Sequence, residues 1–196
     1  FKMNVSKIKI LLISASGKGG GPSHIFLLKE LLQNQFEFFL AMPFSNSKIK
    51  TINNKKYLNI SERKISLKDL IELIKFSRKN KIDIIHAHGK GAGLIARIIK
   101  LFLHKPLIYT FHGIHTNCLT RLNSFLYIFY ENSTGWIDNE KVFVSQSERM
   151  KAKYLKIFIG KNNRVINNAS KEMHRIRLNQ ERNNLNIGIN NNKKNI

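Results

Sequence analysis

Residues 7–23 read KIKILLISASGKGGGPS. The segment 7–14 is a short apolar run rich in β-branched residues, which is typical of a strand buried in a parallel sheet. Glycines follow it, and beyond them the apolar residues of the segment 25–32 recur at helical spacing, which predicts a helix that starts near Ser23. Strand, glycine turn and helix in this order form the unit from which α/β sheets are built.

The same alternation continues along the chain. We predict further strands at residues 36–41, 82–88, 106–111, 141–145 and 164–167. We predict further helices at residues 66–79, 94–103, 119–135 and 146–158, and a loop or edge structure over 43–60. This repetition predicts an α/β fold with a Rossmann-like, doubly wound parallel sheet.

Length and composition fit one domain. The chain has 196 residues, of which 42% are hydrophobic, and this is enough for a single sizeable core. We therefore assign residues 1–169 to one Rossmann-like domain. From Ser170 onward the chain is charged, rich in asparagine and poor in apolar residues, so we predict a linker or a disordered tail over 170–196.

The chain is strongly basic, with 34 Lys and Arg against 12 Asp and Glu and a formal net charge of +22. Such a balance favours an anionic partner, such as a nucleic acid, a phosphorylated ligand or an anionic membrane surface. The basic residues are scattered among many asparagines, as an AT-rich coding sequence would produce without selection for binding. Both explanations of the charge stay open.

Several classes of protein are disfavoured. No nucleic-acid motif is recognised, so we expect no specific nucleic-acid partner, and a basic nucleic-acid-binding module stays an alternative. The single cysteine, Cys118, excludes an internal disulfide. Charges interrupt every apolar stretch before the ~18 residues of a membrane-spanning helix. We expect a cytoplasmic protein that can associate with the inner face of the cytoplasmic membrane.

The candidate binding residues follow the predicted strands, at the edge where open parallel sheets bind ligands. The glycine turn allows backbone N–H groups to approach a ligand, and the helix behind it presents its positive end to an anion. The turn is neither a Walker loop nor a complete dinucleotide motif, so a turn without a ligand stays open. His112 stands at a strand end beside Gly113, where its ring can hydrogen-bond a sugar hydroxyl or a phosphate; a purely structural histidine is the alternative.

The sequence His86-Ala87-His88 raises the question of a metal site, to which His112 and His115 could add ligands. Such sites need carboxylates nearby, and alternation along the strand places Asp83 on the opposite side from His86. We therefore expect no metal and no cofactor, with a histidine-based metallohydrolase as the alternative. One histidine of the pair is expected to pack at the sheet edge while the other faces the cleft.

The predicted helix 119–135 is aromatic. Its apolar residues at helical spacing favour packing in the core; they are Leu119, Leu122, Phe125, Leu126 and Phe129. The alternative is a surface for a lipid-linked substrate, formed by Phe125, Tyr127 and Tyr130 near Arg121.

Taken together, these pieces resemble the N-terminal domain of family 4 glycosyltransferases of GT-B fold, of the bacterial capsule and O-antigen type. The resemblance covers nearly all of residues 7–168. It is carried by residues 9–21 with their glycines, 83–97, 106–113, Glu131 and Asp138 with 142–148, and 165–168. The chain departs from the family pattern at Phe111, where proline is common, and at Asn167 and Asn168.

The resemblance implies a retaining transferase that moves a sugar from a nucleotide-sugar donor to a cell-envelope glycan or lipid-linked acceptor without an obligatory metal. By position, Gly20 and Gly21 would line the cleft near the donor phosphates and the acceptor, and His112 would be the catalytic residue that contacts the transferred sugar. His88 and Gly113 would help to bind substrate. In this family the donor is held mainly by a C-terminal domain, which the 196 residues do not contain, so we expect the chain alone to be inactive.

Overall fold

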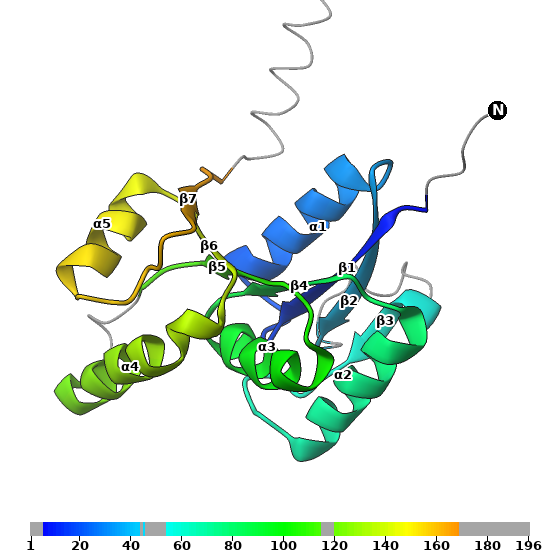
Figure 1. Ribbon diagram of the computed structural model, residues 1–196, viewed down its shortest axis with the longest axis horizontal. Coiled ribbons are helices and arrows are strands. Elements are labelled where there is room, and N and C mark those ends of the chain that lie inside the picture. Colours follow the sequence, from blue (N-terminus) through cyan, green and yellow to red (C-terminus); the bar gives the residue numbers. More distant parts are fainter. Residues whose placement is uncertain (1–5, 44, 46–53, 115–119, 169–196) are drawn as a thin grey trace, which may run out of the picture.

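The computed structural model describes residues 6–43, 45, 54–114 and 120–168. Seven parallel strands form one sheet in the order β3-β2-β1-β4-β5-β6-β7 (Figure 1). The strands are β1 (Ile8–Ser14), β2 (Phe36–Met42), β3 (Tyr57–Asn59), β4 (Ile84–His88), β5 (Leu107–Phe111), β6 (Glu140–Phe143) and β7 (Asn163–Val165).

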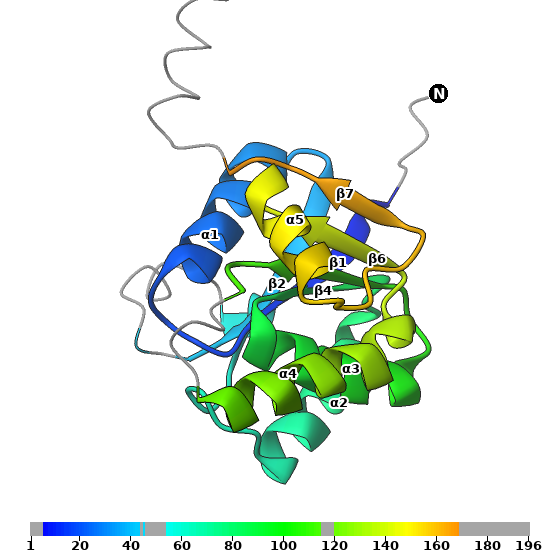
Figure 2. The ribbon, with the colours of Figure 1, turned by 90° about the vertical axis from the view of Figure 1, so that its left-hand side faces the viewer.

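Helices cover both faces of this sheet. They are α1 (Gly20–Leu32), α2 (Leu67–Asn80), α3 (Lys90–Leu103), α4 (Arg121–Thr134) and α5 (Gln146–Tyr154), with short 3-10 helices η2 (Asn54–Lys56) and η3 (Gly135–Ile137). Helices α1 and α5 lie on one face, and α2, α3 and α4 lie on the other (Figure 2). The Rossmann-like α/β fold predicted from the sequence is thereby confirmed, and the strand order reverses between β1 and β4.

Strand β1 lies in the middle of the core. Leu12 is fully buried and packs in a cluster with Ile25 of α1. Leu11 and Ile13 are also fully buried and belong to the larger cluster on the other face, with residues of α2 and α3. Because successive side chains of a strand point to opposite faces, the continuous apolar stretch 10–13 must be covered on both sides, as the run 7–14 indicated.

The glycines after β4 do not form the expected lead-in, because α3 begins at Lys90 instead of Leu94. A Cβ atom on Gly91 would lie 2.8 Å from the Cβ of Ala15, and one on Gly93 would lie 2.9 Å from the ring of Tyr109. These glycines therefore let the first turn of α3 pack closely against the sheet.

Other boundaries also differ from the prediction. Helix α1 begins at Gly20, and α5 ends at Tyr154. The short strand β3 lies in the predicted loop or edge region and pairs with β2. The predicted tail 170–196 lies outside the described residues.

A buried ionic cluster joins α3 to α4 and to the segment before β6. Arg97 is 1% exposed, and its guanidinium donates two hydrogen bonds to Asp138, of 2.9 and 2.7 Å, and one of 2.8 Å to Glu131. Thr134 accepts a fourth bond, of 2.9 Å, and the ammonium of Lys141 lies 3.1 Å from Asp138. The paired charges compensate each other's desolvation and hold α4 beside α3.

Within the described part of the chain, no helix is both long enough and apolar enough to span a bilayer.

Candidate functional site

A cleft of about 920 Å³ opens at the carboxyl ends of β1, β4 and β5. Open α/β sheets bind ligands at this point, where the strand order reverses. The five residues predicted from the sequence to bind or react all line it: Gly20, Gly21, His88, His112 and Gly113. Helix α4 also lines the cleft, through Leu126, Tyr127 and Tyr130.

Two helices begin at this cleft. Gly19 and Gly89 are the residues before α1 and α3, and both have positive φ angles, of 103° and 84°, which glycine adopts without strain. Neither helix has an acidic residue in its first turn. Free N–H groups and the helix dipole attract anions at such termini, and Lys18, Arg63 and Lys90 add positive charge to the lining.

The glycine turn brings backbone close to the histidines. A Cβ atom on Gly21 would lie 3.7 Å from the carbonyl oxygen of His88 and 3.8 Å from Cδ2 of His112, whereas one on Gly20 would meet nothing within 4 Å. A larger side chain at position 21 would therefore extend toward the histidines and reduce the space available to a ligand.

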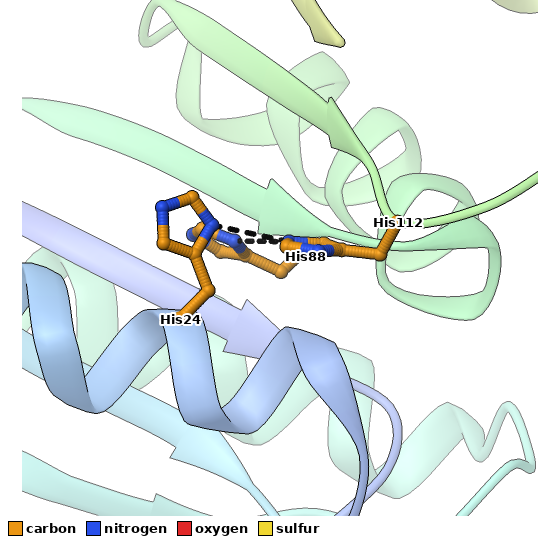
Figure 3. Close-up of side chains that lie close together, drawn as sticks. All are labelled: His24, His88 and His112. Atoms are coloured by element: carbon orange, nitrogen blue, oxygen red, sulfur yellow. Dashed lines mark hydrogen bonds between the residues drawn. The ribbon is translucent and has the colours of Figure 1, made fainter. Parts of the chain in front are cut away.

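Three imidazole rings, those of His24, His88 and His112, lie close together (Figure 3), and two of them line the cleft. His88 is the last residue of β4 and is 3% exposed, His112 follows β5, and His24 projects from α1. The Nε2 atom of His112 lies 3.0 Å from Nδ1 of His88 and 3.5 Å from Nδ1 of His24. Beyond His112, Gly113 has a φ of 105°, and the backbone N–H of Ile114 donates to Glu148 at 2.8 Å, which holds the turn in place.

Burial keeps these imidazoles neutral. It lowers the pKa of His112 to about 4, and that of His88 well below its ordinary value. It also lowers the pKa of His24. A neutral imidazole has one donor and one acceptor nitrogen, so Nε2 of His112 can donate its proton to only one of its two neighbours at a time. Nε2 of His88 has no hydrogen-bond partner within the described residues.

His86 plays a different part from His88. The Nε2 atom of His86 lies 2.8 Å from the hydroxyl of Thr110, and the centroid of its ring lies 4.1 Å from that of His88. His86 does not line the cleft. Burial lowers its pKa to about 3. Of the expectation for this pair, the cleft-facing histidine is confirmed as His88, whereas His86 packs against His88 and Thr110 but is only partly buried.

The histidines that could bind a metal in the structure differ from those considered for the sequence. Among the described residues, the group of potential metal ligands is His24, His88 and His112, without His86, and His115 lies outside the described residues. The carboxylate of Asp83 accepts a bond from the backbone of Lys9 instead. Sequence reasoning missed His24, because a helix-borne histidine shows no link to β4 and β5 until the order of the strands is known.

The expected core packing of the aromatic helix is wrong for four residues of α4. Leu122, Phe125, Leu126 and Phe129 are 66, 64, 50 and 61% exposed. The inward side of α4 is occupied by Tyr127 and by Glu131 with its ionic partners, so the larger apolar side chains point outward. The alternative surface is also corrected, because Tyr127 and Tyr130 line the cleft and only Phe125 belongs to the exposed side.

Comparisons with known proteins identify the family and similar folds. A family model described as Glycosyltransferase Family 4 matches residues 18–169. No curated protein sequence matches the chain significantly.

The solved structures with a similar fold include the following three. Anabaena HepE in complex with UDP and glucose has a TM-score of 0.62 at 16% identity, over 83% of this chain and 45% of that one. A glycosyltransferase from Rickettsia africae has a TM-score of 0.62 at 19% identity, over 83% of this chain and 43% of that one. Sucrose-phosphate synthase from Thermosynechococcus elongatus has a TM-score of 0.57 at 14% identity, over 90% of this chain and 98% of that one. This chain thus spans less than half the length of the first two, and the likeness concerns the fold.

Proposed function

The chain belongs to glycosyltransferase family 4, and on this premise we propose that it is the acceptor-side half of a retaining GT-B glycosyltransferase. In this proposal a sugar passes from a nucleotide-sugar donor to a cell-envelope glycan or a lipid-linked acceptor. Residues 1–169 form the domain and 170–196 a linker, and a donor-binding half completes the enzyme. The chain's 45% coverage of HepE supports a two-half enzyme.

The observation that carries the proposal is the meeting of two helix N-termini and a neutral imidazole cluster in one cleft. The termini of α1 and α3, with Lys90 beside them, favour the negative charge of a phosphate. The imidazoles supply hydrogen bonds without adding a competing charge. A nucleotide sugar presents both chemistries, an anionic pyrophosphate and a ring of hydroxyl groups.

His112 is the catalytic residue in this proposal. Its ring lines the cleft and burial keeps it neutral, so it can contact the transferring sugar through a hydrogen bond. Such a contact accelerates a reaction when it strengthens as charge develops in the transition state. His88 orients the ring of His112 across 3.0 Å. Gly20, Gly21 and Gly113 leave room for the substrate, and the step needs no metal.

The acceptor side of the cleft supports a lipid-linked substrate. Leu126 lines the cleft and is also 50% exposed, so the apolar surface of α4 continues from the site to the outside. We call the exposed residues Leu122, Phe125, Leu126 and Phe129 the α4 apolar face. This face and the net charge of +22 support association with the anionic inner face of the cytoplasmic membrane.

The test is sugar transfer by the assembled enzyme, which we define as these 196 residues joined by fusion or co-expression to a donor-binding domain of the same family. Labelled UDP- and GDP-sugars are offered with a lipid extract and with soluble glycans as acceptors. We expect label to move into the lipid fraction. An assembled enzyme that binds a donor yet transfers sugar to neither class of acceptor would refute the proposal.

A further inference from the structure

We propose that His24, His88 and His112 form a binding site for one divalent transition-metal ion of the zinc type, and that an ion bound there blocks sugar transfer. The site lies at the edge of the cleft, which His88 and His112 line and His24 does not, and its ligands come from three separate elements, α1, β4 and the turn after β5 (Figure 3). Only the inhibitory consequence rests on the proposed function.

Two of the distances between the ring nitrogens are close to those around a tetrahedral ion. Zinc bound to imidazole at about 2.0–2.1 Å requires ligand atoms about 3.3–3.4 Å apart. Nε2 of His112 lies 3.0 Å from Nδ1 of His88 and 3.5 Å from Nδ1 of His24. The ligand atoms of the three histidines all lie within 4.8 Å of one another, so small ring rotations bring all three to an ion.

The donor set selects the class of ion. Three imidazoles with one open position are a known ligand set for zinc, and imidazole also suits copper and nickel. The absence of carboxylates, which argued against a metal in the sequence, therefore does not argue against this set. Because His88 and His112 line the cleft, water or another ligand can reach the fourth position.

The chemistry around the site limits how tightly it binds an ion and which ions it binds. Metal-bound histidines usually donate their second N–H to an acceptor, and loss of such a partner weakens binding by about 10- to 100-fold. Nε2 of His88 has no acceptor within the described residues, so we expect weaker binding than at a structural zinc site. Magnesium prefers oxygen ligands, and the three histidines offer none.

Inhibition follows because the ion and the proposed reaction both use the ring of His112. An ion would occupy the Nε2 atom of His112 and hold the ring toward His24 and His88, so the ring could no longer contact a sugar in the proposed reaction. The ion would also add positive charge and bulk beside Gly21, whose Cβ position lies 3.8 Å from the ring of His112.

The first experiment uses the 196-residue chain without an affinity tag, stripped of metal by a chelator. Zinc binding is measured by calorimetry, and cobalt binding by the visible absorption of tetrahedral Co²⁺. We expect one ion per chain, no competition from excess Mg²⁺, and a loss of affinity of at least about tenfold in His24→Ala and in His112→Ala. His104→Asn is the matched control, because His104 is exposed and adopts a φ of 53° that asparagine tolerates.

Circular dichroism of each variant shows whether the fold is retained. Failure to bind zinc, or zinc binding that is unchanged in folded His24→Ala, would overturn the site and leave the transferase proposal intact. The second experiment adds zinc to the assembled enzyme, where we expect activity to fall and to recover with chelator. Activity that zinc leaves unchanged at saturation would overturn the inhibitory role alone.

Discussion

The Nδ1 atom of His88 lies 3.0 Å from the Nε2 atom of His112, although 24 residues separate them in the chain. The contact arises because β4 and β5 are parallel neighbours, with His88 paired to Thr110, so both histidines emerge at the same edge. His112 extends past the strand end into the cleft, and His88 stays buried behind it.

His86 and His112, both partly buried, predict a loss of stability in mild acid. Burial lowers the folded-state pKa of His112 to about 4 and of His86 to about 3, so below the ordinary histidine pKa of about 6.5 the unfolded chain binds more protons. The free energy of unfolding should therefore fall as the pH drops from about 6.5 toward 4, by up to about 1.4 kcal/mol per pH unit for each such histidine. Urea unfolding with chelator present measures it.

The control for this prediction is a comparison of slopes. His86→Gln should flatten the dependence by about 1.4 kcal/mol per pH unit. Equal slopes in the native chain and in His86→Gln would contradict the neutral state of His86.

Removal of the Arg97 guanidinium should destabilise the chain strongly. Arg97→Met leaves Glu131 and Asp138 buried without their main partner, and breaking such a cluster costs about 3–5 kcal/mol. Arg164→Met is the matched control, because Arg164 pairs with Glu140 at the surface and its side chain is 73% exposed. There we expect a change below about 1 kcal/mol in the same urea titration.

Residues 1–196 by themselves should bind nucleotide sugars weakly or not at all. In the proposed enzyme the pyrophosphate is held mainly by the other half, and this chain adds only the weaker attraction of its two helix N-termini and Lys90. Calorimetry against UDP- and GDP-sugars tests this. A low-micromolar dissociation constant, equivalent to about 8 kcal/mol of binding free energy, would show that this half alone holds the donor.

The basic charge predicts binding to anionic vesicles that weakens steeply with salt, because exposed charges are screened over ~8 Å at physiological ionic strength. The double variant Phe125→Ser with Phe129→Ser should reduce binding through the α4 apolar face. Tyr154→Ser, 86% exposed on α5, serves as control. Sedimentation with vesicles gives the bound fraction, and equal binding to neutral and anionic vesicles would mean that the charge reflects composition only.

Local signals explain which parts of the fold could be predicted. The apolar run 7–14 identifies a buried strand by itself, and the residues after strand ends identify the binding edge once the sheet is parallel. His88 and His112 were therefore within reach of the sequence. His24 was not, because its place beside them depends on how α1 crosses the sheet.

Long-range packing explains the errors. Helical spacing shows that α4 carries an apolar stripe, but it does not show which way the stripe points. The inward side was taken by Glu131, whose partner Arg97 lies 34 residues earlier in the chain, and no local pattern links the two. Gly91 and Gly93 likewise resemble a flexible lead-in until Ala15 and Tyr109 are seen against them.

The central claim is that His112 contacts the transferring sugar, and it is tested most directly by the kcat of His112→Ala in the assembled enzyme. His88→Ala should have a milder effect, because His88 acts through His112, and His86→Ala should act mainly through stability. We predict that His112→Ala lowers kcat by ~10²-fold or more, the scale of a lost transition-state contact, with little change in the urea midpoint. Full activity in a folded His112→Ala enzyme would contradict the claim.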